Sequence, residues 1–137
     1  MPILAWMVAR TNITLTVADI EFNAQIGSGF FIGHPQGIVI GRGTIIGKHV
    51  TLFQGVPFEV KSWDISSFNK FSEIGNNCYF FAYRGAMGDV KIANRCVIAT
   101  HSKVMKDLPE GSLAVGVPAK TKPGKGDELN LTWTVAE

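Results

Sequence analysis

The feature that most constrains the fold of this chain is a spacing of six between aliphatic and aromatic positions. The spacing holds in three blocks, residues 20–32, 40–58 and 74–104. An α-helix repeats every 3.6 residues and cannot keep a strict period of six, whereas hexapeptide repeats are typical of a parallel β-helix. Each hexad forms a short strand and a corner, and three hexads close one triangular coil. The sequence therefore predicts an all-β solenoid, a parallel β-helix.

Residues that are eighteen apart lie one above the other on successive coils of such a fold. Cys78 and Cys96 have this spacing, and we expect both to face inward as free, buried thiols. Tyr83 and His101 have it too, and we expect them to stack at a corner. His49 is expected at the surface. Two cysteines are too few for a disulfide framework or a zinc site.

Two breaks in the period mark the places where chemistry is expected. Ile32 and Ile40 are eight residues apart, so two extra residues bulge out of the coil around His34. The second break predicts a protruding loop over about residues 60–72. Insertions in a solenoid lie at its corners and often on the binding face.

Size and composition exclude several other classes of protein. The chain has 137 residues, of which 46% are hydrophobic, enough for one domain with a core. The formal net charge of +2 is too small to indicate nucleic-acid binding. No apolar run reaches the roughly 18 residues of a membrane span, and the N-terminus lacks the features of a signal peptide. A cytoplasmic protein is therefore expected.

The hexapeptide period, the phrase GHPQGIVIG and the ending KDLPEGSLAVGVPAK together resemble the hexapeptide acyltransferases, in particular their serine acetyltransferase-like branch. The resemblance implies a left-handed parallel β-helix, usually a homotrimer with active sites between subunits. It also implies acetyl transfer from acetyl-CoA to a small-molecule hydroxyl acceptor. It covers residues 19–120, which leaves a lead-in at 1–18 and a C-terminal tail at 121–137. Without a larger helical N-terminal domain, we expect the trimer not to pair into a hexamer.

The resemblance also implies a catalytic pair. The family's general base is the histidine of the GHPQGIVIG element, which is His34 here, and its carboxylate partner lies fifteen residues earlier, at Asp19. Neutral imidazole is suited to remove a hydroxyl proton near pH 7, and a carboxylate can orient it. The alternative for His34 is an ordinary turn residue beside glycine and proline. No metal is expected.

The family's CoA site implies a second set of residues, at one corner and in the terminal segment. These residues are Ala82, Gly116, Pro118, Ala119 and Lys120, with Lys120 offered to the CoA phosphates. The alternative for the terminal segment is a structural role, as the cap that ends the solenoid. The alternative for Lys120 is an ordinary position in a solvated tail. The corner itself is bulkier than is usual in the family.

The expected acceptor-binding positions depart from the family's serine enzymes. Gly33 stands where those enzymes usually have an aspartate, and their Arg-His-Pro loop is replaced by one that carries Trp63 and Phe71. The main prediction is therefore acetyl transfer to a saccharide or similar hydroxyl, with Gly33, Trp63 and Phe71 at the acceptor. The alternatives are L-serine as the acceptor and a solenoid that binds or assembles without catalysis. The loop has its own alternative, packing against a neighbouring subunit.

Overall fold

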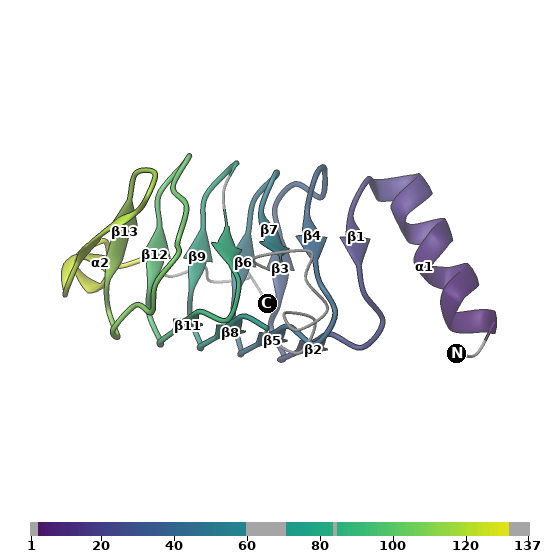
Figure 1. Cartoon of the computed structure of the whole chain (residues 1–137), viewed down its shortest axis with the longest axis horizontal. Coiled ribbons are helices and arrows are strands. Elements are labelled where there is room, and N and C mark those ends of the chain that lie inside the picture. The colour runs from purple at the N-terminus through teal and green to yellow at the C-terminus, as the bar shows by residue number, and fades with distance from the viewer. Residues whose placement is uncertain (1–2, 60–70, 84, 132–137) are drawn as a thin grey trace.

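The chain forms a β-solenoid with a helix beside each end (Figure 1). The computed structural model describes residues 3–59, 71–83 and 85–131. Each of the first four coils contributes one short strand to each of three faces, which we call A, B and C, and the described residues after β12 add strands to face C alone. Within the described ranges, no helix is long and apolar enough to cross a bilayer.

The strands are two or three residues long, as expected for hexads. Face A consists of β1 (Asp19–Ile20), β4 (Val39–Ile40), β7 (Pro57–Glu59) and β10 (Ala86–Met87). Face B consists of β2 (Gln25–Ile26), β5 (Ile45–Ile46), β8 (Glu73–Ile74) and β11 (Lys91–Ile92). Face C consists of β3 (Phe31–Ile32), β6 (Thr51–Leu52), β9 (Tyr79–Phe80), β12 (Val97–Ile98) and β13 (Leu113–Val115), and β14 (Lys120–Lys122) adds to β13. The pairing of β14 with β13 is antiparallel, and the other strand pairs are parallel.

The strand register confirms the period of six and the predicted parallel β-helix. Ile26 pairs with Ile46 on face B, and both precede a glycine corner. On face A, Asp19 pairs with Val39, twenty positions later, so the first coil contains the two extra residues expected around His34. The second break ends earlier than predicted, because Ile45 N donates to Ser72 O at 3.1 Å and Ser72 is buried in the coil. Residues 60–70 of the predicted loop lie outside the described part.

The core runs along the inside of the coils and consists of the hexad anchors and the residues two positions before them. Phe58 and Phe80 meet edge to face near its centre, with ring centroids 5.0 Å apart. The largest other fully buried side chains are Ile38, Ile40, Leu52, Ile98, Val50 and Val56. Burial of each such side chain stabilises the fold by about 1.5–3 kcal/mol.

Residues 1–18, predicted only as a lead-in, contain the helix α1 (Ile3–Thr16). The helical segment itself has neither glycine nor proline, and good helix formers such as Leu4 and Ala5 favour the helix. Val17 ends the helix at a φ of 57°, and the Asn12 amide donates to Ala18 O at 2.9 Å. No residue of α1 is buried, so its apolar side chains remain exposed at the end of the solenoid.

At the other end, the tail folds back onto the last coil through α2 (Lys125–Glu128). Arg95 Nε donates to Asp127 Oδ1 at 2.9 Å, and Arg95 Nη1 donates to Glu110 Oε1 at 2.6 Å. Gly126 N donates to Gly111 O at 2.8 Å. The contacts of Gly126 and Asp127 hold α2 against the final coil.

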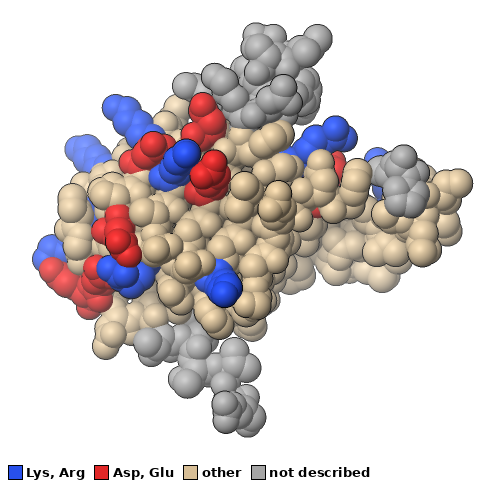
Figure 2. Space-filling model, turned by 90° about the horizontal axis from the view of Figure 1, so that it is seen from below, with Lys and Arg blue, Asp and Glu red and all other residues tan. Residues whose placement is uncertain are grey.

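Side chains of both charge signs lie on the underside of the solenoid, where face B is turned to solvent (Figure 2). Lys91 Nζ and Glu73 Oε2, for example, are 3.6 Å apart. Both side chains are exposed, so their ion pair adds little stability.

Candidate active site

One corner of the triangular coil carries most of the site residues expected from the sequence. We call it the C–A edge, where face C turns into face A, and its described residues are 33–37, 53–55, 81–83 and 99–101. Backbone hydrogen bonds of 2.8–3.1 Å connect each level to the next: Gly37 N to Val17 O, Gly55 N to Gln36 O, Tyr83 N to Gln54 O and His101 N to Ala82 O. The edge is therefore a continuous ladder along the solenoid.

His34 lies in the bulge at the first level of this edge, and its side chain is exposed. Its imidazole is beside Phe53 of the next coil, with ring centroids 6.4 Å apart and planes at 50°. Among the described residues, no hydrogen bond fixes either ring nitrogen of His34. The bulge is thus able to present an accessible imidazole at the edge.

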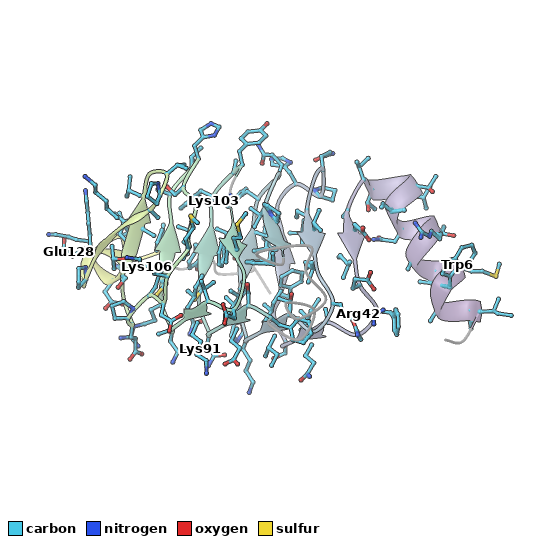
Figure 3. The ribbon with its side chains drawn as sticks, in the orientation of Figure 1. Trp6, Arg42, Lys91, Lys103, Lys106 and Glu128 are labelled. Atoms are coloured by element: carbon cyan, nitrogen blue, oxygen red, sulfur yellow. The ribbon has the colours of Figure 1, made fainter. Side chains whose placement is uncertain are left out.

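Asp19 lies beside the same edge, at the start of β1. Gly37 N donates to Val17 O at 3.0 Å, and Asp19 N donates to Ile38 O at 2.8 Å, which ties the strand of Asp19 to the bulge of His34. No hydrogen bond joins the two side chains within the described part of the chain. The exposed Asp19 side chain instead lines a shallow pocket between α1 and the first coils, together with Trp6, Arg10, Glu21 and Arg42 (Figure 3).

The residues expected around CoA lie at the other end of the C–A edge. Ala82 is in the ladder itself, and its carbonyl accepts from His101 N at 3.1 Å. Lys103 N donates to Gly116 O at 3.0 Å, and Ala119 N donates to Lys103 O at 2.9 Å. The peptide bond before Pro118 is cis, and the exposed Lys120 begins β14. The expected base and Ala82 therefore lie on the same edge, Gly116 and Ala119 follow just beyond it, and Lys120 lies on face C.

Tyr83 and His101 stack on this edge, as their spacing of eighteen predicts. Their ring centroids are 5.4 Å apart and their planes differ by 10°. The Tyr83 ring lies over Gly55, where an added Cβ would be 2.7 Å from Tyr83 Cδ1. The two rings therefore occupy the same edge as Ala82, where part of the CoA site is expected.

Of the two aromatic residues that were expected to bind the acceptor from the loop, the structure describes only one. Trp63 lies outside the described residues. Phe71 lies over Gly43, where an added Cβ would be 2.6 Å from Phe71 Cε2, at the corner between faces A and B. Within one subunit Phe71 and His34 therefore lie on different edges of the solenoid.

Comparisons with known proteins find relatives that match most of the chain. A serine acetyltransferase of Staphylococcus epidermidis is 28% identical to the chain over 131 residues, which are 96% of this chain and 61% of that protein. One of Helicobacter pylori is 35% identical over 112 residues, 78% of this chain and 61% of that protein. No protein-family model matches the chain. The chain spans about three fifths of the length of these curated relatives.

Solved structures show the same fold. A serine acetyltransferase in complex with CoA gives a TM-score of 0.79 at 25% identity, over 87% of this chain and 48% of that one. Soybean serine acetyltransferase complexed with serine gives 0.81 at 26% identity, over the same shares of the two chains. The chain is similar in sequence to serine acetyltransferases over most of its length, and it shares their hexapeptide-repeat β-solenoid fold.

Within this family fold, the sequence analysis missed two residues near His34. Phe53 and Phe81 stack on the C–A edge with ring centroids 5.5 Å apart and planes at 8°. Each follows the inward anchor of a face C strand, Leu52 or Phe80. The position after each anchor was therefore the signal that would have found this stack.

Among the described residues, no group of three or more His, Cys, Asp or Glu side chains is arranged to hold a metal ion. The chemistry that the described site offers comes from two exposed imidazoles, those of His34 and His101, a carboxylate beside the same edge, and the backbone of that edge. Such a set can accept a proton and can hold an extended ligand alongside.

Proposed function

We propose that this chain transfers an acetyl group from acetyl-CoA to an acceptor hydroxyl. The observation that carries the proposal is that His34 and Ala82 lie on successive levels of the C–A edge, and that Gly116 and Ala119 hydrogen bond to Lys103 just beyond the last of these levels. The relatives named serine acetyltransferases, one of them solved in complex with CoA, support the same activity.

The proposed reaction needs one proton acceptor. The His34 imidazole takes the proton of the acceptor hydroxyl while the oxygen attacks the thioester carbonyl carbon of acetyl-CoA. The C–S bond then breaks, and the CoA thiolate receives the proton from the His34 imidazolium. Asp19 orients the imidazole and stabilises its charged form, which requires its side chain to turn from the α1 pocket toward His34.

For CoA itself we propose the backbone around Ala82, Gly116 and Ala119, with Pro118 shaping the turn. The Lys120 ammonium is exposed and would pair with a phosphate of CoA. We further propose a homotrimer, in which a neighbouring subunit completes each site. The apolar side chains that α1 leaves exposed favour association with another copy.

The acceptor that the comparisons favour is L-serine, because the relatives carry that name and the soybean enzyme is solved with serine. A saccharide hydroxyl is the second candidate, and the Phe53–Phe81 stack beside His34 is the observation that favours it. A solenoid that binds without catalysis is favoured only by the Tyr83–His101 stack, which narrows the CoA corner.

A thiol-release assay tests the proposed activity. Purified protein is incubated with acetyl-CoA and either L-serine or a panel of monosaccharides, and free CoA is measured with a thiol reagent. Acceptor-dependent CoA release, with mass spectrometry identifying the acetylated product, is the expected result. If calorimetry detects CoA binding but no acceptor is acetylated, the proposed catalysis is rejected, and a solenoid that binds CoA without catalysis takes its place.

A further inference from the structure

The pocket between α1 and the first two coils carries charges of both signs. Its volume is about 200 Å³, and Asp19, the expected partner of His34, lies in its wall. Figure 3 shows two of its residues, Trp6 on α1 and Arg42 beyond β4. The charged side chains of this α1 pocket are two arginines and two carboxylates, Arg10, Arg42, Asp19 and Glu21.

These four charged groups are not paired with one another. Among the described residues, none of the four side chains makes a hydrogen bond or an ion pair. Arg95, by contrast, contacts both Asp127 and Glu110 at the other end of the solenoid. Opposite charges within reach of each other form such pairs, so the arginines and the carboxylates of the α1 pocket lie too far apart to do so. A ligand that carries both charges would fit between them.

Both carboxylates extend from a stretch of backbone that is fixed to the next coil. Asp19 N donates to Ile38 O at 2.8 Å, and Glu21 N donates to Ile40 O at 3.0 Å. Glu21 is half-buried, whereas Asp19 is exposed. Residues two apart in an extended chain point to the same side, so the two carboxylates face the pocket together. Such a pair suits an ammonium group, which has three N–H donors.

The arginine on α1 is restrained by an aromatic ring. The guanidinium carbon of Arg10 lies over the Trp6 ring, 5.7 Å from its centroid. This contact holds the guanidinium without pairing it to another charge, so its N–H groups remain available to a carboxylate. Arg42 offers a second guanidinium to the same space. The rest of the pocket wall is apolar and consists of Ala9, Ile13, Ile20 and Phe22.

We propose that the α1 pocket binds a small zwitterionic amino acid with an apolar side chain. The ligand carboxylate pairs with the arginines, its ammonium group pairs with the carboxylates, and its side chain lies against the apolar wall. The pocket is smaller than the roughly 300–1,000 Å³ of most sites for drug-sized ligands, which limits the ligand to about the size of an amino acid.

A bound amino acid would inhibit acetyl transfer. Asp19 can either pair with the ammonium group of the ligand or turn to orient the His34 imidazole, but it cannot do both. Ligand binding therefore shifts Asp19 toward the position in which it does not assist catalysis. This inhibitory effect rests on the proposed function, whereas binding in the pocket does not.

Calorimetry with the full chain tests the site without acetyl transfer. The probes are L-leucine and L-phenylalanine, which have no hydroxyl to accept an acetyl group. N-acetyl-L-leucine and L-leucinamide are the matched compounds, and each lacks one of the two charges. We expect a free amino acid to bind, and the loss of either charge to weaken binding about tenfold or more. No binding of either amino acid, or equal binding of all three leucine compounds, would overturn the proposal.

Two variants that each remove one charge locate the binding site. Arg42→Gln and Glu21→Gln keep a polar side chain at their positions, and each should weaken binding of the better amino acid about tenfold. Lys106→Gln is the control, because Lys106 is exposed on a different part of the solenoid, and this variant should bind like wild type (Figure 3). Wild-type affinity in both Arg42→Gln and Glu21→Gln would place the ligand elsewhere and reject the pocket.

The kinetics of acetyl transfer test the effect on Asp19. At a saturating concentration of the amino acid, kcat should decrease toward that of Asp19→Asn, and additional acceptor should not restore it. Asp19→Asn itself should not be inhibited further. An amino acid that only raises the KM for the acceptor would be bound at the acceptor site, and that result would contradict the inhibitory role.

Binding and activity together separate this proposal from the proposed function. Amino-acid binding that Arg42→Gln weakens, in a protein that acetylates nothing, would keep the α1 pocket and reject the enzyme. Acetyl transfer by a protein that binds neither L-leucine nor L-phenylalanine would keep the enzyme and reject the pocket.

Discussion

Cys78 and Cys96 lie one above the other on adjacent coils, and both side chains are fully buried. Cys78 Sγ is 3.2 Å from Ala93 O, and Cys96 Sγ is 3.2 Å from Pro109 O. Both cysteines are free thiols, as their spacing and number predict. The hydrogen bond with Cys96 and the burial of the group raise the pKa of the Cys78 thiol.

This pair predicts protected thiols and a contribution of Cys78 to stability that falls in alkali. Neither cysteine should react with a thiol reagent at pH 8 until the protein unfolds. Above the ordinary thiol pKa of about 8.5, the unfolded chain loses the Cys78 proton while the folded chain keeps it. The contribution of Cys78 to the free energy of unfolding should therefore decrease as pH rises beyond that value, whereas Cys96, whose pKa is lowered by its hydrogen bond with Cys78, contributes in the opposite sense. Urea titrations of wild type and Cys78→Ala at several pH values measure the difference.

Cys78→Ala is the comparison for this pH dependence. The variant should be less stable than wild type at neutral pH because it leaves a cavity, but its stability should decrease less between pH 8 and 10. An identical alkaline slope in the variant would assign the effect to other groups.

The close approach of Gly126 to the last coil predicts how the C-terminal tail can be released. A Cβ at this position would be 2.6 Å from Ser112 O and 2.8 Å from Gly111 O. Because these are backbone atoms, Gly126→Ala should push α2 off the coil. Hydrogen exchange at the Gly126 amide should accelerate about tenfold or more, which corresponds to about 1.4 kcal/mol of lost protection. Lys125→Ala removes only an exposed ion pair with Glu128 and should change the exchange rate of the Gly126 amide little.

Two asparagines predict a smaller and more specific loss of stability. Lys48 N donates to Asn76 Oδ1 and Asn76 N donates to Asn94 Oδ1, both at 2.8 Å. Asn94→Ala removes one of these acceptors and should cost about 0.5–1.5 kcal/mol in urea unfolding. Asn94→Asp keeps an acceptor oxygen in place and should cost clearly less. A loss of the same size in both variants would show that the hydrogen bond is not the cause.

The period of six predicted the solenoid because its anchors are set by burial. Ile46 and Ile74, for example, come from blocks separated by an insertion, yet they pair in register because both must face the same core. The bulge at His34 was predicted in the same way, from the spacing of eight between Ile32 and Ile40. Residues that keep the core repeat could thus be placed on their coils from spacing alone.

The helix α1 could not be predicted in the same way, whereas the Phe53–Phe81 stack was available from the repeat and was missed. The apolar side chains of α1, including Ile3, Leu4 and Leu15, are exposed, so no burial pattern marks them in the sequence. Phe53 is twenty positions after Gly33 and twenty-eight before Phe81, because insertions lengthen two coils. They nevertheless stack, because Leu52 and Phe80, the anchors that precede Phe53 and Phe81, pair in register.

The central claim is that His34 acts as the base in acetyl transfer, and the most direct measurement is the kcat of His34→Ala with acetyl-CoA and the best acceptor. We expect a decrease of about 10² to 10⁴, the usual contribution of a positioned general base. Asp19→Asn should decrease kcat less, and His49→Ala should leave it as in wild type. Circular dichroism and sedimentation should show the same fold and assembly in all variants. Transfer by His34→Ala at a rate near that of wild type would contradict the assignment of the base and the function built on it.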